Sequence, residues 1–278
     1  MIKAQNGSGF AEINGAKLYY EVAGNPDGET LVFVHAGVAD SRLWDDQVPF
    51  FGGKYRVIRY DMRGFGKSEP VEGEYAHRDD LYALLQHFDV EKTHLVGCSM
   101  GGGFCLDNAL LQPQIALSVT MVCSGPGGLN LDIEAPALAA KFEQAEALWG
   151  NRDIEAVNEI ETQIWFDGIS RTPADVDPVV RAKALDMNRI ALTHEAKGLG
   201  KHKPPMQPST TERLGELHLP ILMIVGALDT PYIQAASDYM VEHVPSAKKV
   251  IIQNTAHLPS MERPGEFNQI LMDFLNSL

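Results

Sequence analysis

Three things that the sequence has little of limit what it can encode. It has only 3 cysteines in 278 residues and no C-x-x-C or H-E-x-x-H pattern, so we expect neither a disulfide framework nor a metal site. Its 23 basic residues are outnumbered by 37 acidic ones, and the net charge of -14 argues against a nucleic-acid partner, because phosphate binding needs a basic surface. No apolar run is long enough to span a bilayer and the first residues lack the apolar core of a signal peptide, so we expect a cytoplasmic protein with no membrane partner.

The composition, 45% hydrophobic and 22% charged, is typical of a globular protein, and 278 residues are enough for one large domain with an insertion. Apolar runs alternate with amphipathic stretches along most of the chain, which predicts an α/β fold with a mostly parallel sheet covered by helices. Asn14-Gly15 between the first two runs predicts a hairpin. The predicted strands are residues 10–13, 18–22, 31–34, 55–60, 94–97, 117–123, 221–225 and 250–252, and the predicted helices are 41–50, 77–88, 100–111, 232–244 and 266–275.

The alternation stops between residues 128 and 217. This segment contains three helical stretches, 136–149, 153–166 and 178–197, with no predicted strand between them, and Asp177 before Pro178 indicates a helix start. A helical insert in a sheet protein is most simply a lid over the C-terminal edge of the strands, where ligands of open α/β sheets bind. We therefore divide the chain into a core of residues 1–127 and 218–278 and a helical lid of residues 128–217.

One glycine-rich motif carries chemistry. Gly97-Cys98-Ser99-Met100-Gly101 follows a predicted strand and precedes a predicted helix, which is the setting of the G-x-S-x-G nucleophile elbow. Small neighbours let such a turn close tightly, so the serine hydroxyl stands above the sheet and the helix N-terminus faces the developing negative charge. We predict that Ser99 is a nucleophile rather than part of an ordinary glycine-rich turn.

A serine hydroxyl needs a base, and position along the chain selects one of the nine histidines. His257 follows the last predicted strand and so lies at the C-terminal edge of the sheet, and an imidazole titrates near neutral pH. His35 braces its own loop in this interpretation. We expect the others to lie on solvated faces, to make local hydrogen bonds or to sit at the wrong edge of the sheet: His77, His87, His94, His194, His202, His218 and His243.

The base needs a carboxylate that fixes its tautomer, and the tetrahedral intermediate needs hydrogen-bond donors. Asp229 comes directly after the strand 221–225 and completes the order Ser, Asp, His; residues 124–127, after the earlier strand 117–123, contain no carboxylate. For the oxyanion hole we predict the backbone N–H of Met100, the residue after the nucleophile, and that of Gly37, in the small-residue loop after the strand 31–34.

With these motifs in place, the chain resembles the α/β-hydrolase superfamily along nearly its whole length, and is most similar to small-lidded bacterial esterases and enol-lactonases. Residues 35–37, 61–68, the elbow, Asp229 and residues 256–259 with Glu262 and Pro264 carry the resemblance. It implies an eight-stranded sheet with an antiparallel second strand and the insert after strand six. Ala36, where many relatives have glycine, is one departure.

The triad and the resemblance predict an enzyme: a serine hydrolase that cleaves small carboxylic esters or lactones through an acyl-enzyme on Ser99, with no cofactor. Three alternatives stay open. They are a carbon–carbon hydrolase, although such relatives often carry Trp where this chain has Leu258; a cofactor-free haloperoxidase; and a ligand-binding signalling protein of the same fold. The sequence leaves the oligomeric state open, a homo-oligomer included.

The substrate pocket is expected to take walls from Trp149, Trp165, Phe166 and Leu258. Because Trp165 and Phe166 are adjacent, they cannot both face the same side of a helix. Arg171, Arg181 and Arg189 in the insert either bind a substrate carboxylate or lie on the surface.

Overall fold

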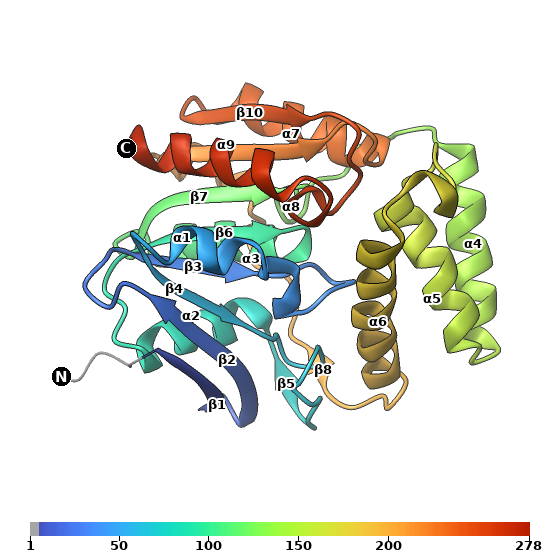
Figure 1. Ribbon diagram of the computed structural model, residues 1–278, viewed down its shortest axis with the longest axis horizontal. Helices are drawn as coiled ribbons and strands as arrows, with labels where there is room; N and C mark the ends of the chain where they lie inside the picture. Colours follow the sequence, from blue (N-terminus) through green and yellow to red (C-terminus); the bar gives the residue numbers. More distant parts are fainter. Residues whose placement is uncertain (1–5) are drawn as a thin grey trace.

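The computed structural model describes residues 6–278. Residues 1–5, on which the signal-peptide expectation partly rests, lie outside the described residues. The central feature is an eight-stranded sheet in the order β1-β2-β4-β3-β6-β7-β9-β10 (Figure 1). All its neighbouring strands run parallel except that β2 is antiparallel to both β1 and β4, as the resemblance implies. The strands are β1 (Gly7–Ile13), β2 (Ala16–Gly24), β3 (Thr30–Val34), β4 (Arg56–Tyr60), β6 (Thr93–Cys98), β7 (Ala116–Val122), β9 (Ile221–Gly226) and β10 (Ala247–Ile252).

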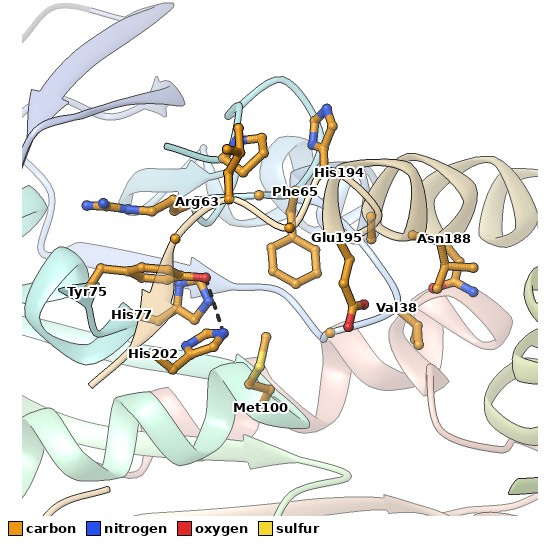
Figure 2. Close-up of a pocket in the computed structure, with 18 of the residues that line it drawn as sticks. Val38, Arg63, Phe65, Tyr75, His77, Met100, Asn188, His194, Glu195 and His202 are labelled. Atoms are coloured by element: carbon orange, nitrogen blue, oxygen red, sulfur yellow. Dashed lines mark hydrogen bonds between the residues drawn. The ribbon is translucent and has the colours of Figure 1, made fainter. Parts of the chain in front are cut away.

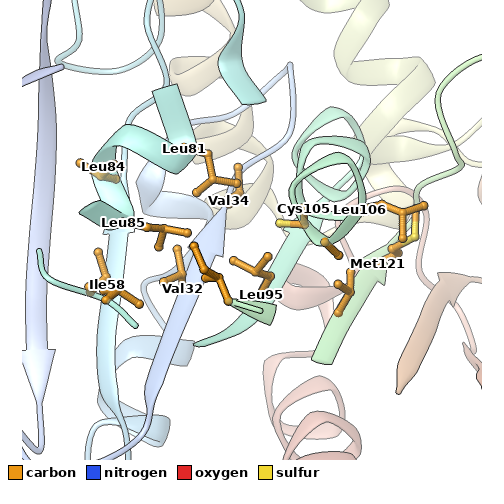
Figure 3. Close-up of a cluster of buried hydrophobic side chains, with 14 of the residues drawn as sticks. Val32, Val34, Ile58, Leu81, Leu84, Leu85, Leu95, Cys105, Leu106 and Met121 are labelled. Carbon is orange, nitrogen blue, oxygen red and sulfur yellow. The ribbon is translucent and has the colours of Figure 1, made fainter. Parts of the chain in front are cut away.

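The central strands are buried on both faces, which explains their continuous apolar sequences. Side chains of β3 alternate between two cores: Val32 and Val34 belong to one, Leu31 and Phe33 to the other. The first core packs under α2 (His77–His87) and α3 (Met100–Leu111), whose apolar residues lie at helical spacing (Figure 3). The second packs under α1 (Gln47–Phe51) and α9 (Pro264–Asn276). The helices therefore cover both faces, as predicted.

Several turns and helix ends have the conformation that the local sequence predicts. Asn14 and Gly15 both have positive φ, 46° and 80°, as a two-residue hairpin requires. The Asp177 side chain accepts hydrogen bonds from the backbone N–H groups of Val179 and Val180 and caps α6 (Pro178–Glu195). The first helix after the insert, α7 (Pro231–His243), is capped by the Thr230 side chain, which accepts from the backbone N–H of Ile233.

Three predicted elements differ from the structure. The helix predicted over residues 41–50 is a 3₁₀ helix (Ser41–Trp44) followed by α1, because Pro49 has no N–H to continue one helix through this segment. In place of the single helix predicted over 153–166, the structure has α5 (Ile154–Thr162) followed directly by a π-helical turn (Gln163–Asp167). The insert, predicted to hold no strand, contains β8 (Lys201–His202), which pairs with β5 (Glu74–Tyr75).

The insert helices α4 (Pro136–Gly150), α5 and α6 gather at the end of the sheet opposite the C-terminus (Figure 1). The two ends of the insert lie side by side. The backbone N–H of Thr211, near its end, donates to the carbonyl oxygen of Gly127, near its start, at 3.0 Å. We call this junction the neck. Among residues 6–278, no helix has the length and apolar character needed to cross a membrane.

Candidate active site

Ser99 occupies a strained turn between β6 and α3. Its backbone has φ 52° and ψ -120°, which is costly for a residue with a side chain. Four hydrogen bonds hold the turn. Ser99 N–H donates to the Val122 carbonyl at 2.8 Å, and the Ser99 carbonyl accepts from Gly102 N–H at 3.0 Å, from Gly103 N–H at 3.2 Å and from the Ser124 hydroxyl at 2.6 Å. The side chain is half-buried at the start of the helix. The surrounding structure thus holds Ser99 in a conformation that the chain alone disfavours.

The glycines of the motif are required by close backbone approach. A Cβ on Gly97 would lie 2.3 Å from the carbonyl oxygen of Gly101, and a Cβ on Gly101 would lie 2.4 Å from that of His35. Since real Cβ atoms do not approach backbone so closely, any other residue at either position has to shift the strand or the helix. The sequence G-x-S-x-G is therefore explained by packing at this turn.

Asp229 and His257 form a buried pair at the same edge of the sheet. His257 Nδ1 lies 2.8 Å from Asp229 Oδ2 and 3.0 Å from Oδ1, and the two side chains are 2% and 1% exposed. Asp229 Oδ1 also accepts from the backbone N–H of Thr230 at 2.7 Å. Because a carboxylate only accepts hydrogen bonds, Nδ1 carries the proton and Nε2 is left as the basic nitrogen.

The histidine loop lies beside the elbow. The Cys98 thiol, one residue before Ser99, is 3.6 Å from the carbonyl oxygen of His257. Within the described chain no hydrogen bond joins the Ser99 hydroxyl to His257. The structure therefore brings Asp229 and His257 into contact and holds Ser99 next to their loop, while the contact between nucleophile and base is not made. Without bound substrate, catalytic hydrogen bonds are often long.

The two residues predicted to form the oxyanion hole lie near each other. A Cβ on Gly37 would contact the Met100 Cε at 3.6 Å, so the Gly37 backbone faces the Met100 side chain. His35 braces this loop as expected: its Nε2 accepts from the backbone N–H of Met62 at 2.9 Å, and its Nδ1 donates to the Ala36 carbonyl at 2.8 Å. Burial lowers the pKa of His35, which keeps it neutral in this bracing role.

The insert is tied to the histidine loop by Trp165. The backbone N–H of His257 donates to the Trp165 carbonyl at 3.1 Å, and the two rings lie 4.5 Å apart. Trp165 belongs to the π-helical turn, a local distortion that is often found at functional sites. Its neighbour Phe166 points the other way and is fully buried in the second core with Leu258. The adjacent aromatics thus pack in different apolar clusters, although both also border one narrow space.

A second link joins the insert to the same loop. Arg171 donates to Glu262 Oε2 at 2.7 Å and to the carbonyl oxygens of Phe166 and Asn254, and Glu262 Oε1 accepts from the backbone N–H of Ala256 at 2.7 Å. The Arg171 and Glu262 side chains are 13% and 7% exposed. Burial raises the pKa of Glu262, while Arg171 opposes this shift. Arg171 therefore belongs to an internal ion pair.

The predicted pocket residues are not gathered in one place. Trp165, Phe166 and Leu258 line a narrow space of about 10 Å³, whereas Trp149 lines another cavity, of about 320 Å³, with Ile154 and Glu195. A larger cavity, of about 480 Å³, is lined by Gly37 and Met100 among others. A second cavity, of about 380 Å³, lies on the Ser99 side of Met100.

Sequence reasoning missed most of the 480 Å³ cavity. Its far wall includes Tyr75, His77 and His202, which the pairing of β5 with β8 brings together (Figure 2). The prediction that His77 is solvated or hydrogen-bonded locally is wrong: it is 2% exposed, and neither ring nitrogen has a hydrogen-bond partner in the described chain. Burial lowers the pKa of His77 to about 3, so the ring is neutral. No local signal could place residues 75 and 202 side by side.

One trio of side chains has the atom types of a metal site. Within residues 6–278, Cys123, Asp229 and His257 offer ligand atoms within 4.8 Å of one another, all buried. Burial, and then the nearby Asp229, raise the pKa of the Cys123 thiol well above its usual value, which disfavours the thiolate that a metal binds. The trio is better suited to a hydrogen-bonded pair with a packed thiol than to a metal.

Comparison with known proteins identifies the fold family. Residues 29–264 match the family described as alpha/beta hydrolase fold. The chain belongs to this family. Among curated proteins, this α/β-hydrolase is 24% identical to 3-oxoadipate enol-lactonase 1 of Acinetobacter baylyi, over 95% of each chain. It is 26% identical to a 2-hydroxy-6-oxononadienedioate/2-hydroxy-6-oxononatrienedioate hydrolase of Cupriavidus pinatubonensis, over 97% of this chain and 96% of that one.

A solved structure extends this likeness. The crystal structure of bromoperoxidase from Bacillus anthracis matches the α/β-hydrolase described here with a TM-score of 0.77 and 26% identity, covering 97% of this chain and all of the other. The relatives thus include a lactonase, a carbon–carbon hydrolase and a bromoperoxidase. Together they support hydrolase chemistry for this family member and leave its particular reaction to be inferred from the site.

Proposed function

We propose that this α/β-hydrolase cleaves small carboxylic esters or lactones through an acyl-enzyme on Ser99. The observation that carries the proposal is the buried Asp229–His257 pair, 2.8 Å apart, beside the strained turn of Ser99 at one sheet edge. A buried carboxylate that fixes an imidazole close to a half-buried hydroxyl is the arrangement that activates a serine. The name of the enol-lactonase relative agrees with this reaction class.

In the proposed mechanism, Ser99 Oγ attacks the carbonyl carbon while His257 Nε2 takes its proton. Asp229 stabilises the imidazolium that forms. The negative oxygen accepts hydrogen bonds from the backbone N–H groups of Gly37 and Met100. The intermediate then expels the alcohol, which receives the proton from His257, and leaves an ester on Ser99.

Water completes the cycle. His257 takes a proton from the water as it attacks the acyl-enzyme, the same two N–H groups stabilise the second intermediate, and the proton returns to Ser99 Oγ as the carboxylic acid leaves. Ester and water become alcohol and acid, so no redox partner is required. The residues named supply the nucleophile, the base and the oxyanion donors.

Steady-state turnover of p-nitrophenyl butyrate by the wild type and Ser99→Ala tests the proposal. We expect Ser99→Ala to lose turnover and also the covalent butyryl adduct, which mass spectrometry detects on the wild type. Ser237→Ala is the matched control, because this hydroxyl bonds only within its own helix. Full activity in Ser99→Ala refutes the proposal, and so does a wild type that binds the ester without turning it over.

A further inference from the structure

The 480 Å³ cavity is placed to receive the acyl part of a substrate. It is large enough for a small-molecule ligand, for which volumes of about 300–1,000 Å³ are usual. Neither Ser99 nor His257 lines this cavity, which borders Gly37 and Met100, the two residues proposed for the oxyanion hole. Met100 also lines the cavity beside Ser99, so an acyl group carried by Ser99 would reach the 480 Å³ cavity past the Met100 side chain.

The arginines of the insert do not offer a carboxylate clamp to this space. Arg171 is paired with Glu262, Arg181 with Asp167 and Glu159, and Arg189 with Glu155. None of the three lines the cavity. The expectation that one of them binds a substrate carboxylate therefore finds no support in the contacts they make.

The one arginine on the cavity wall is already neutralised. Arg63 donates from Nε and Nη2 to the two carboxylate oxygens of Asp80 at 3.1 and 3.0 Å, and both side chains are almost fully buried. Its guanidinium also lies over the Tyr75 ring, 4.7 Å from the centroid (Figure 2). The Arg63–Asp80 pair brings no net positive charge to the cavity.

Two carboxylates on the insert side are not neutralised. Glu161 accepts a hydrogen bond from Asn188 Nδ2 at 2.8 Å, and neither Glu161 nor Glu195 has an ion-pair partner within residues 6–278. Figure 2 shows the Glu195 carboxylate directed toward the space between Met100 and Val38. Burial raises the pKa of Glu161, and the negative charge of Glu195 adds to this shift. Glu161 is half-buried, whereas Glu195 is exposed and water screens part of its charge. This wall therefore disfavours a further negative charge mainly where it would approach Glu161.

The opposite wall can form hydrogen bonds without carrying a fixed charge. His77 is neutral and has no partner for its ring nitrogens, and the Tyr75 hydroxyl lies 3.2 Å from His202 Nε2. Leaving a buried polar group unsatisfied costs free energy, so a ligand that bonds to it is favoured. An amide, hydroxyl or ketone at the end of the acyl chain meets this requirement.

We propose that the cavity selects an uncharged, hydrogen-bonding acyl group and that Glu161 and Glu195 exclude substrates with a carboxylate there. This inference rests on the proposed function and narrows its substrate class. It separates the chain from its relatives named for an oxoadipate lactone and a dioate, whose substrates carry carboxylates. Like charges brought together at a binding site reduce affinity strongly.

Matched p-nitrophenyl esters test the inference: the adipate monoester ends in a carboxylate, and the adipamate ester replaces it with a neutral amide of the same shape. We expect the wild type to have a kcat/KM at least about tenfold higher for adipamate, mainly through KM. The variant Glu161→Gln/Glu195→Gln should bring the two substrates closer by a similar factor. The readout is a ratio within one enzyme sample, so a partly unfolded variant does not distort it.

Glu143→Gln/Glu146→Gln is the control. It removes two negative charges from exposed positions on the insert helix α4, away from the cavity, and should leave the ratio unchanged. A third ester, p-nitrophenyl hexanoate, tests the other wall: His202→Phe should lower the turnover of adipamate relative to hexanoate by several-fold.

Any of three results overturns the inference. The first is an equal kcat/KM for the adipate and adipamate esters in the wild type, and the second is an adipamate-to-adipate ratio of kcat/KM that Glu161→Gln/Glu195→Gln leaves unchanged. The third is a change of that ratio in Glu143→Gln/Glu146→Gln that is as large as in Glu161→Gln/Glu195→Gln. If Ser99-dependent turnover persists in those cases, the proposed function stands and only the substrate class is wrong. If Ser99→Ala hydrolyses all three esters at the wild-type rate, the proposed function itself fails.

Discussion

Asp229 decides which nitrogen of His257 carries the proton. Its carboxylate holds Nδ1–H at 2.8 Å and so leaves Nε2 free to receive a proton. An amide in its place can donate to Nδ1, which moves the proton to Nε2 and removes the base. At this site, therefore, the chemistry depends on a single side-chain acceptor.

We expect Asp229→Asn to fold normally and to lower kcat for p-nitrophenyl butyrate by about 10⁴-fold, as the wrong tautomer does in serine hydrolases. Circular dichroism checks the fold and steady-state kinetics check kcat. Asp238→Asn, an exposed aspartate of α7 paired with Lys249, is the control and should keep wild-type kcat. Unchanged kinetics in Asp229→Asn would assign the acid to another residue.

At the scale of single residues, the sequence identifies those site residues that belong to a motif or follow a predicted strand. Ser99 is indicated by its glycines, whose close contacts the structure explains, and Asp229 and His257 by their positions after two parallel strands. The walls of the large cavity could not be predicted in the same way. His77 looks like the first residue of an amphipathic helix, and only a contact between residues 75 and 202 shows that it is enclosed.

Among the elements, the connection between the insert and the histidine loop is the most consequential. Arg171 and Glu262 join the π-helical turn to residues 254–256 through a largely buried ion pair. Breaking such a pair by removing one partner leaves an uncompensated buried charge, which is far more costly than the pair is stabilising.

We expect Arg171→Met to destabilise the protein by about 3 kcal/mol, because Glu262 then remains buried without its cation. Arg171→Met/Glu262→Gln should be less destabilised than the single variant, since Gln is neutral and can still accept from Ala256 N–H. Urea denaturation of the four members of this cycle measures the coupling. If the changes in unfolding free energy of the two single variants add up to that of the double variant, the ion pair contributes nothing to stability.

Elements with a strong local pattern were predicted well, such as α3, whose observed bounds equal the predicted 100–111. Elements whose bounds depend on one missing backbone N–H, or on pairing with a distant segment, were not predicted correctly. Pro49 interrupts the helix predicted over 41–50 through one missing N–H, and the two-residue strands β5 and β8 are too short to leave an alternating pattern.

For the whole molecule, buried histidines link folding to pH. Burial lowers the pKa of His35, His77 and His94, and that of His77 reaches about 3, against about 6.5 in an unfolded chain. Between these two values the unfolded state binds more protons than the folded state. Stability is therefore fully present above about pH 6.5 and is lost as the pH falls toward 3.

His77→Phe should make stability less sensitive to acid. One proton accounts for at most about 1.4 kcal/mol per pH unit, and its uptake by the unfolded chain begins only near pH 6.5, so the loss in unfolding free energy between pH 7 and 5 should shrink by about 2 kcal/mol. Urea titrations at the two pH values give this difference. His87→Phe, an exposed ring on the same helix, should not change it. An identical acid loss in His77→Phe and the wild type would contradict the assignment.

The neck between Gly127 and Thr211 brings the two ends of the insert together, but it is not the insert's only attachment. Trp165 and Arg171 bind the histidine loop, and β8 pairs with β5. A segment transplanted from a relative between Gly127 and Thr211 therefore has to supply its own partner for Glu262 and its own strand for β5. We expect chimeras that lack these contacts to be less stable than those that restore them, which urea denaturation measures.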